Sequence, residues 1–380
     1  MKISAPFAVF ACLAPLLLPA QAPLQADRAF GQLEVVARFD SGPIPTGITV
    51  SKHGRIFLNF PHWVDPVDAT VVELKDGKTV AYLEGLPQSG PAAPADKLMS
   101  AQSVVVDPKD RLWILDTGRI AGAPAPAGGP KLIGVDLATN KAFQKILFPA
   151  EIASAGSYLN DVRFDYSRGA AGFAYITDSS FLSPGIVVVD LATGKSWRRL
   201  AHHPSTAADL TFQPYVEGEQ LIDSGADWKP FHPKSASDGI ALSADHKWLY
   251  YCPLISRHLY RVSAALLADP AAMEEAVAKT VEDMGDKGMS DGMESDREGN
   301  IYFGDLEGNS IRRLRPDGRF ELIAHDPRIL WADTLSLAND GYLYFTANQL
   351  NRLPRFHGGK DLRVLPYVLF RVKIDGHPID

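Results

Sequence analysis

The feature that most constrains this 380-residue chain is a repeated pair of short apolar strands. Each unit begins with a small polar residue, continues as an apolar strand, turns at a Gly, Asp, Asn or His, and returns as a second apolar or aromatic strand. In the fourth unit, for example, residues 238–242 (DGIAL) lead through Asp245-His246 to residues 248–251 (WLYY). Six such units begin at Gly47, Ser103, Asp161, Asp238, Asp291 and Asp333.

The spacing of these units predicts a β-propeller. Propeller blades contain four strands and typically take about 40 to 50 residues, and the six units begin 42 to 77 residues apart. The sequence therefore predicts an all-β, six-bladed β-propeller that forms a single domain over residues 23–380. Further apolar segments predict outer strands at residues 131–137, 185–191, 258–262 and 368–372.

Two segments are expected to interrupt the strands. Residues 271–284 carry Met273, Ala276, Val277 and Val281 at helical spacing, which predicts one short helical insertion. Residues 202–237 form a long stretch with no strand pattern. Loops of that length in a compact domain are usually functional or mobile, so we expect a lid over the channel.

The N-terminus is typical of a signal peptide. Lys2 precedes an apolar run from Ala5 to Leu18, and Ala20-Gln21-Ala22 fits the small-x-small cleavage pattern. We therefore expect residues 1–22 to be removed near Ala22 and the protein to be secreted or periplasmic; an uncleaved membrane anchor is the alternative. Cleavage would leave Cys252 as the remaining cysteine, which predicts no internal disulfide.

Charge and motifs exclude several classes of protein. The net charge is −7 and no long run of Lys or Arg occurs, which argues against nucleic acid as a partner. No later apolar stretch is long enough for a membrane helix. The sequence lacks the His-Glu-x-x-His motif of zincins and the phosphate-binding Gly-x-x-x-x-Gly-Lys-Ser/Thr loop of nucleotidases. We expect a monomer whose partner is a small molecule.

Polar residues at the strand starts predict a ligand site. The innermost strands of a propeller all start at one face of the channel, so residues at equivalent starts converge. Several carboxylates near one axis must be protonated, hydrogen-bonded or bound to a cation, and an oxygen-only set suits Ca²⁺. The alternative is that each Asp caps a turn. The predicted ligand-binding residues at these starts are Asn160, Asp161, Asp238, Asp291 and Asp333.

A second group of polar residues falls at the ends of the second strands. Because these strands run antiparallel to the first, their ends are expected near the same face. This group adds Asp116, Asp178, Asp305 and Asn348, with Asn59, to the ligand-binding candidates; loop fixation is the alternative. In the long loop, His202, His203 and His232 are candidates for a general base. Phe181, Trp228 and Phe231 are candidates for apolar or aromatic pocket walls, with packing as the alternative.

Longer segments carry a family resemblance. They include LWILDTG at 112–118, YLNDVRFD at 158–165, GIVVVDLATGKSW at 185–197, SDGIALSADHKWLYYCPLISRHLYRV at 237–262 and WADTLSLANDGYLYFTANQLNRLP at 331–354. In these segments the chain resembles the major royal jelly protein/yellow family. The resemblance implies a six-bladed propeller, secretion and a small-molecule pocket at one end of the channel. Some yellow proteins are associated with dopachrome conversion and others bind biogenic amines, so the family does not imply one reaction.

The chain is more distantly similar to the regucalcin/gluconolactonase propellers. That resemblance implies a divalent metal held by a Glu, two Asn and an Asp at blade starts. By motif, Asn160 and Asp238 stand where the two Asn would be, and Asp291 stands in the matching Asp-Gly-Met. Thr46-Gly47 occupies the place expected for the Glu. The metal set Asn160, Asp238 and Asp291 is therefore incomplete, which weakens the case for lactonase chemistry.

Three functions remain open from the sequence. The first is an exported propeller that binds a small molecule in its central channel. The second is an enzyme, either a metal-assisted lactone hydrolase or a dopachrome-type isomerase, with Asp238 and Asp291 as candidate catalytic residues. The third is a protein-interaction scaffold, although no blade ends in the Trp-Asp dipeptide of WD repeats.

Overall fold

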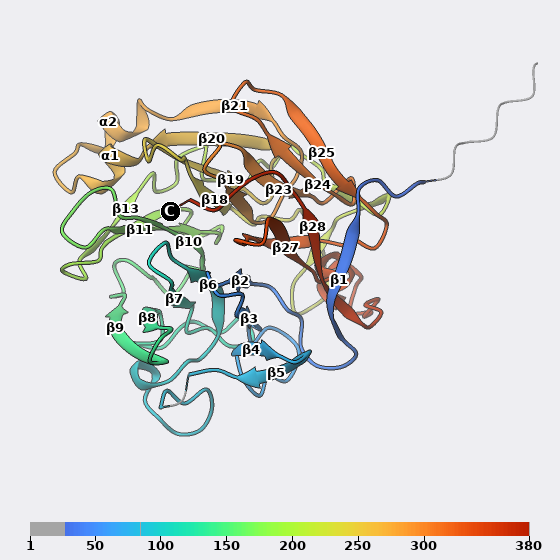
Figure 1. Cartoon of the computed structure of the whole chain (residues 1–380), viewed down its shortest axis with the longest axis horizontal. Helices are drawn as coiled ribbons and strands as arrows, with labels where there is room; N and C mark the ends of the chain where they lie inside the picture. Colours follow the sequence, from blue (N-terminus) through green and yellow to red (C-terminus); the bar gives the residue numbers. More distant parts are fainter. Residues whose placement is uncertain (1–26, 84, 380) are drawn as a thin grey trace, which may run out of the picture.

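The computed structural model describes residues 27–83 and 85–379, and it confirms the predicted six-bladed β-propeller. Six four-stranded antiparallel sheets surround a central channel (Figure 1). The innermost strands contact one another in a closed ring, in the order β2, β6, β10, β18, β22, β26 and back to β2. The predicted signal peptide lies outside the described residues.

Five blades are each built from consecutive strands, ordered from the channel outward. Blade 1 contains β2 (Ile48–Val50), β3 (Ile56–Asn59), β4 (Val71–Lys75) and β5 (Lys78–Ala81). Blade 2 contains β6 (Ala101–Val106), β7 (Arg111–Asp116), β8 (Lys131–Asp136) and β9 (Lys141–Leu147). Blade 3 contains β10 (Leu159–Asp165), β11 (Phe173–Asp178), β12 (Gly185–Asp190) and β13 (Ser196–Arg199). Blade 4 contains β18 (Ser237–Leu242), β19 (Trp248–Pro253), β20 (His258–Ser263) and β21 (Glu282–Asp286). Blade 5 contains β22 (Met293–Ser295), β23 (Ile301–Asp305), β24 (Ser310–Leu314) and β25 (Phe320–His325).

Blade 6 closes the ring with strands from both ends of the chain. Its inner strands are β26 (Ala332–Leu337), β27 (Tyr342–Ala347) and β28 (Tyr367–Lys373), and its outermost strand is β1 (Leu33–Phe39). β1 pairs antiparallel with β28 from Leu33↔Val372 to Phe39↔Tyr367. The repeat pattern of the sequence did not predict β1, because that strand stands alone before the first unit.

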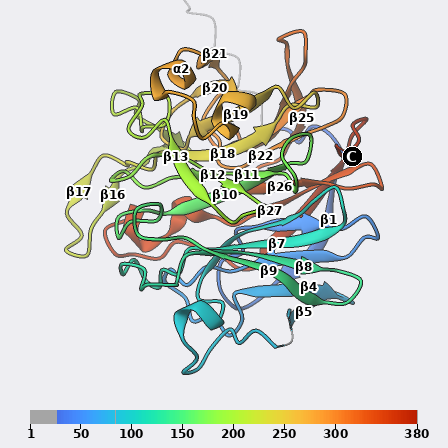
Figure 2. The ribbon, with the colours of Figure 1, turned by 90° about the vertical axis from the view of Figure 1, so that its left-hand side faces the viewer.

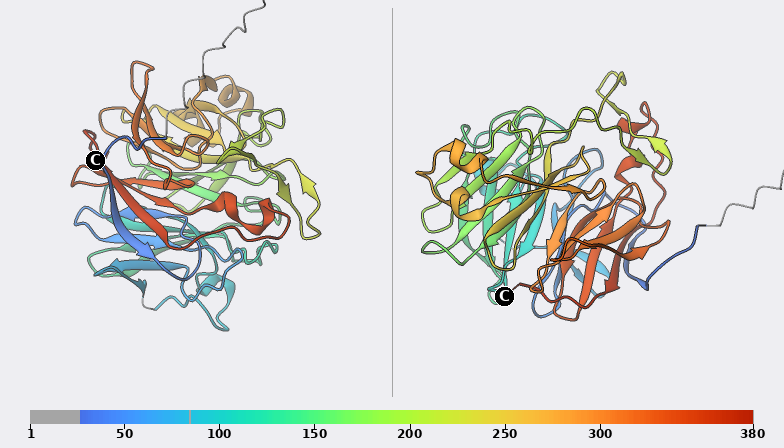
Figure 3. Two further views of the ribbon diagram at one scale, coloured as in Figure 1. Left: turned by 90° about the vertical axis from the view of Figure 1, so that its right-hand side faces the viewer. Right: turned by 90° about the horizontal axis from the view of Figure 1, so that it is seen from above.

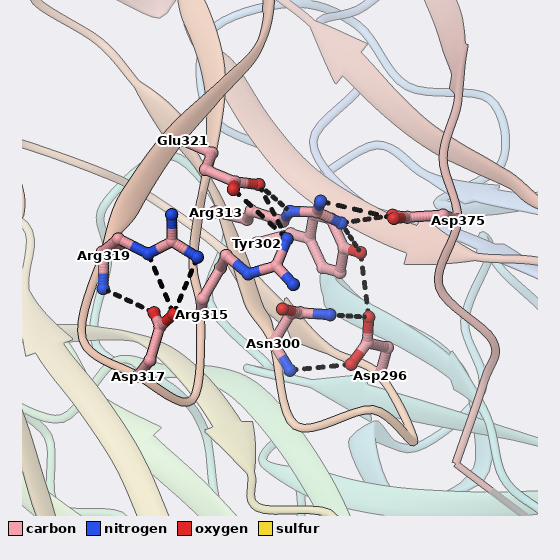
Figure 4. Close-up of polar contacts among 9 residues, drawn as sticks. All are labelled: Asp296, Asn300, Tyr302, Arg313, Arg315, Asp317, Arg319, Glu321 and Asp375. Atoms are coloured by element: carbon pink, nitrogen blue, oxygen red, sulfur yellow. Dashed lines mark hydrogen bonds and ion pairs between the residues drawn. The ribbon is translucent and has the colours of Figure 1, made fainter.

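The segment after β28 adds a second link across the closure. Asp375 forms an ion pair with Arg313 of blade 5, and the Nε of Arg313 also donates to Glu321 Oε2 at 2.8 Å (Figure 4). Beside them, Tyr302 Oη donates to Asp296 Oδ2 at 2.8 Å. These contacts fasten the C-terminal segment to blade 5, so that the closure does not depend on β1 alone.

The core consists of apolar layers between neighbouring blades. Between blades 2 and 3, for example, the Trp113 ring stacks on Phe164 with centroids 4.9 Å apart, and Val162 and Ile176 are fully buried beside them. Because each blade is covered on both faces, its strands appear in the sequence as apolar runs rather than as strict alternation. Each large side chain buried in this way contributes about 1.5–3 kcal/mol.

The helical insertion is shorter than predicted. This part of the described chain has two α-helices of five residues each, α1 (Ala264–Ala268) and α2 (Glu274–Ala278), instead of one helix over 271–284. Residues 282–286 form β21, because they pair with β20 as the outer strand of blade 4. Sheet pairing therefore replaces the last residues of the predicted helix, 282–284, by a strand. None of the helices in the described residues is long and apolar enough to cross a membrane.

The long insertion before β18 lies at one end of the channel. It contains two small hairpins, β14 (Tyr215–Val216) with β15 (Glu219–Gln220), and β16 (Asp223–Ser224) with β17 (Pro230–Phe231). The second hairpin projects from the molecule (Figure 2) and lies beside the C-terminal segment around residues 350–356 (Figure 3). Both hairpins contact this segment: Glu217 in the turn of the first pairs with Arg352 at 2.6 Å, and Ser224 Oγ in the second donates to the carbonyl of Arg355 at 2.6 Å.

Candidate functional site

A cavity of about 520 Å³ lies at this end of the channel. Its floor contains four side chains from blades 3 to 6, which we call the floor residues: Asn160, Asp238, Asp291 and Asp333. Its walls come from loops and from the long insertion, and six of the wall side chains are aromatic. These are Trp63, Tyr158, Phe181, Phe231, Trp331 and Phe356. All four floor residues were predicted from the sequence as ligand-binding candidates.

β-bulges aim the floor residues at the cavity. The register between the first and second strands shifts between Leu159 and Val162, between Ser237 and Ile240, and between Ala332 and Leu335. Asn160, Asp238 and Asp333 lie inside these three irregularities. A bulge leaves a residue out of the ladder and redirects its side chain, and bulges are common next to functional sites. A β-bulge therefore redirects one floor side chain in each of three blades.

The glycines of the Asp-Gly pairs let neighbouring blades approach closely. A Cβ at Gly239 would lie 2.2 Å from the carbonyl oxygen of Asp291, and one at Gly292 would lie 2.6 Å from that of Asp333. Gly292 N also donates to the Asp333 carbonyl at 2.7 Å. Glycine is thus required for packing between inner strands, and the Asp before it is carried to the channel wall.

The floor carboxyls have neutral hydrogen-bond partners. Asn160 Nδ2 donates to Asp238 Oδ1, Trp331 Nε1 donates to Asp291 Oδ2 at 2.7 Å, and Asn348 Nδ2 donates to Asp333 Oδ2 at 2.6 Å. Within the described part of the chain, none of the three carboxyls forms an ion pair with a Lys or Arg. Three buried acids therefore share the cavity floor without a direct ion pair among the described residues.

Burial dominates the ionisation of the floor. It raises the pKa of Asp238 and Asp333 well above the usual range, and the charge of Asp291 raises both further. Burial also raises the pKa of Asp291, to about 6, against hydrogen bonds from Asp238 and Trp331 that lower it. Asp291 is consequently the first of the three to ionise, and the other two keep their protons to higher pH.

The other predicted ligand-binding residues do not line the cavity. Asp161 is buried beside the floor, in the same bulge as Asn160, and burial raises its pKa. The remaining four are the strand-end residues Asp116, Asp178, Asp305 and Asn348. The three Asp side chains face backbone amides and cations, and Asn348 donates to the Pro45 carbonyl and to Asp333, so the structure does not bring these four residues into the cavity lining.

The strand-end residues hold loops in place. Asp116 accepts from Met99 N, Ser100 N and Gly118 N at 2.7–2.9 Å and pairs with Lys131 Nζ at 2.8 Å. In blade 3, Asp178 pairs with Arg198 at 3.1 Å, and in blade 5, Asp305 pairs with Arg312 at 3.4 Å. Asn348 differs, because it donates to Asp333 and so supports the floor from behind.

The position that would complete the predicted metal set is closed. Thr46 is fully buried and its Oγ1 accepts from Asn59 Nδ2 at 2.8 Å. A Cβ at Gly47 would lie 1.8 Å from Asn59 Oδ1, so a side chain there would have to displace Asn59. Among the described residues, no three His, Cys, Asp or Glu side chains are grouped to hold a metal ion. The predicted set remains two carboxyls and one amide, which does not match the four-ligand arrangement, and we derive no step through a metal.

Several wall residues were not predicted from the sequence. Tyr158 Oη accepts from Trp63 Nε1 at 2.6 Å and donates to Gln102 Oε1 at 2.7 Å, which joins blades 1, 2 and 3 across the cavity wall. Arg119, Lys234 and Arg355 add positive charge to the walls. The sequence carried a signal for two of these wall residues, because each stands two positions before a predicted floor residue: Trp331 before Asp333, and Tyr158 before Asn160.

The predicted histidines do not line the cavity, whereas two of the three predicted aromatic residues do. His203 Nδ1 lies 2.8 Å from Ser205 Oγ, and both ring nitrogens of His232 face backbone carbonyls at 2.7–2.8 Å. Phe181 and Phe231 are cavity walls, but Trp228 packs against Gly359 instead. The insertion therefore supplies apolar walls and one cation, Lys234, rather than a histidine base.

Together the fold and the cavity define a six-bladed propeller with an acidic floor at one end of its channel. Comparison with known proteins shows which family it belongs to. The family model described as "Major royal jelly protein" matches residues 99–363, so the chain belongs to the major royal jelly protein family. This confirms the resemblance inferred from the sequence motifs.

The curated relatives are yellow proteins of flies. Protein yellow of Drosophila madeirensis is 28% identical over 276 residues, which are 66% of this chain and 46% of that protein. Protein yellow of Drosophila melanogaster is 26% identical over 61% of this chain and 43% of its own length. The matched part of the chain thus spans less than half the length of these relatives.

Solved structures support the fold. The calcium-binding protein regucalcin from Agrobacterium tumefaciens matches with a TM-score of 0.54 and 15% identity, over 91% of this chain and 97% of its own. A gluconolactonase from Xanthomonas campestris matches with a TM-score of 0.51 and 15% identity, over 90% and 89%. At these identities the likeness concerns the propeller fold alone.

Proposed function

We propose that this protein binds a small organic cation, such as a protonated amine, in the cavity at the end of its channel. The observation that carries the proposal is the group of three buried floor carboxyls without a Lys or Arg partner among the described residues. An unbalanced negative charge in a buried site is unfavourable, and a cationic ligand relieves it.

The ionisation of the floor fits a singly charged ligand. Asp291 ionises with a pKa of about 6, while Asp238 and Asp333 hold their protons to higher pH. Near neutral pH the floor thus carries about one negative charge, and the protonated carboxyls can act as further hydrogen-bond donors or acceptors. A single ammonium group matches this pattern.

The walls fit an organic ligand rather than a bare ion. Trp63, Phe181, Phe231 and Trp331 line the cavity, and aromatic faces attract both apolar groups and cations. The volume of about 520 Å³ falls within the range of small-molecule sites, roughly 300–1,000 Å³. An aromatic amine would place its ring against these walls and its ammonium group on the floor.

Benzylamine binding tests the proposal, measured by isothermal titration calorimetry at pH 7.5. We expect Asp291→Asn to weaken binding about tenfold or more, because the substitution removes the ionised partner of the ammonium group. Binding to the unsubstituted protein should also weaken as the pH falls below about 6, because Asp291 then takes up a proton.

Asp317→Asn is the matched control. Asp317 is exposed, lies in the hairpin between β24 and β25, pairs with Arg319 and does not line the cavity. This variant should bind benzylamine as the unsubstituted protein does. Equal affinity of Asp291→Asn and Asp317→Asn would contradict the proposal.

A second function, proton transfer on a bound substrate, is supported by one observation. Asp238 and Asp291 share a hydrogen bond, and the contact raises the pKa of Asp238 while it lowers that of Asp291. Two carboxyls whose pKa values are separated in this way can serve as acid and base. An isomerase of this kind would use Asp291 as the base and Asp238 as the acid, without a metal.

Export belongs to the same proposal. The apolar run from Ala5 to Leu18 and the Ala20-Gln21-Ala22 site support cleavage near Ala22 and a location outside the cytoplasm. N-terminal sequencing of the mature protein tests this directly: a start at or near residue 23 is expected, and retention of Met1 or Lys2 would contradict it.

A further inference from the structure

Two cationic side chains line the cavity without a carboxylate partner in the described chain: Lys234 and Arg119. Lys234 is half-buried, and its Nζ lies 4.8 Å from the Phe181 ring centroid and 5.7 Å from that of Phe231. No hydrogen-bond acceptor contacts this ammonium group among the described residues. Its N–H donors are therefore free to meet a ligand.

Arg119 presents a second partly unused donor group on the other side of blade 3. Its Nε, Nη1 and Nη2 donate to the backbone carbonyls of Ala123, Ser157 and Gly122 at 2.9–3.2 Å. A guanidinium has five N–H groups, so these bonds leave part of its donors unused. The backbone contacts also hold the group in place, 5.9 Å from the Tyr158 ring centroid.

A third wall cation provides a contrast. Arg355 also lines the cavity, but it pairs with Asp223 of the insertion, with its Nε 2.9 Å from Asp223 Oδ1. Its charge is balanced within the protein and it joins two wall segments. Only Lys234 and Arg119 therefore add uncompensated positive charge to the walls, among the described residues, while the floor carries uncompensated negative charge.

We propose that Lys234 and Arg119 form an anion subsite on the cavity wall, and that the ligand is a zwitterion with an aromatic body. Its ammonium group lies on the floor and its carboxylate between these two side chains. The inference rests on the proposed function, because it adds a second contact point to the same ligand. A carboxylate is the expected anion, since the acidic floor disfavours ligands of higher negative charge.

Four aromatic probes separate the two contact points. 4-(Aminomethyl)benzoate carries both charges at opposite ends of a ring, 4-(aminomethyl)benzamide and benzylamine lack the carboxylate, and benzoate lacks the amine. We expect the first to bind about fivefold tighter than the benzamide, as partly exposed ion pairs typically provide. Lys234→Gln and Arg119→Gln should each reduce this preference to below about twofold.

Lys229→Gln is the matched control for the lysine. Lys229 lies on the same insertion, is exposed, pairs with Asp227 at 2.8 Å and does not line the cavity. Because Arg119 also holds its loop, Lys234→Gln is the decisive variant. Circular dichroism melts check that both variants remain folded.

Each result has a defined meaning. Equal affinity for the acid and the amide, or a preference that survives in Lys234→Gln, overturns the anion subsite while benzylamine binding still supports the proposed function. If the acid binds in a Lys234-dependent manner but benzylamine does not bind, the wall subsite stands and the cation-binding floor is wrong. Failure of all four probes overturns both.

Discussion

The floor residues and the strand-end residues have the same chemistry but different surroundings. Asp291 belongs to the first group and Asp116 to the second, and both are buried at the same end of the channel. Asp116 has three backbone amides and the ammonium group of Lys131 within hydrogen-bond distance. Asp291 has one indole N–H and a neighbouring carboxyl.

The difference separates structural acids from functional ones. A buried carboxylate with a full set of donors and a cation has its charge already balanced, and it serves to hold the chain. A buried carboxyl without them ionises reluctantly and retains the capacity to bind a cation or exchange a proton. Loss of a partner should therefore harm the protein in the strand-end group, whereas loss of a floor carboxyl should not.

The largest expected effect is on the Asp116–Lys131 pair, in which both side chains are fully buried. Lys131→Met leaves Asp116 as a buried charge without its cation, and we expect the free energy of unfolding to fall by about 3–5 kcal/mol. Urea denaturation followed by circular dichroism measures this change. Lys145→Met is the control, because Lys145 pairs with Asp96 in an exposed position and should contribute less than about 1 kcal/mol. If the two variants were equally stable, the comparison would fail.

A smaller effect of opposite sign is expected for Asp291→Asn. Folding raises the pKa of Asp291 from 3.8 to about 6, so the native state binds more protons than the unfolded state between these values. Stability contributed by this group is therefore lost as the pH rises from about 4 through 6, and it is not regained above that. The variant lacks this loss and should be more stable than the parent by roughly 1–3 kcal/mol at pH 7.5.

The difference between the two urea curves, measured from pH 4 to 7.5, reports Asp291 together with Asp238 and Asp333, whose pKa values its charge raises, because the remaining groups titrate in both proteins. It should be near zero at pH 4 and grow toward pH 7. A variant that is less stable than the parent at pH 7.5 would show that the Asp291 charge is already balanced, as that of Asp116 is.

The sequence predicted most of the fold, because the repeat is visible in the strands that face the core. Six pairs of inner strands and the outer strands near residues 131, 185, 258 and 368 all appear in the structure. Two strands could not be predicted from the repeat pattern. β1 joins blade 6 through a closure that depends on the whole ring, and β21 takes the last residues of the predicted helix, 282–284, because blade 4 needs a fourth strand.

The site was predicted in part. Asn160, Asp238, Asp291 and Asp333 reach the cavity, because equivalent strand starts converge in any propeller. The sequence could not separate them from Asp116 or Asp178, since the partner cations Lys131 and Arg198 come from other strands of the same blade. The wall cations were missed for a related reason: Arg119 and Lys234 lie in loops whose path has no periodic signal.

The smallest effect is expected for Ca²⁺. The floor offers one amide and three carboxyls, two of which keep their protons to higher pH, and no further donor enters from Thr46-Gly47. Ca²⁺ takes six to eight oxygen ligands, so 1 mM CaCl₂ should raise the melting temperature by less than about 2 °C, a shift of well under 1 kcal/mol. Thermal melts with CaCl₂ or EDTA measure this, and Asp291→Asn is the comparison. A saturable shift that the variant abolishes would mean that the floor binds a metal as well as an organic cation, and that water or ligand atoms complete the coordination.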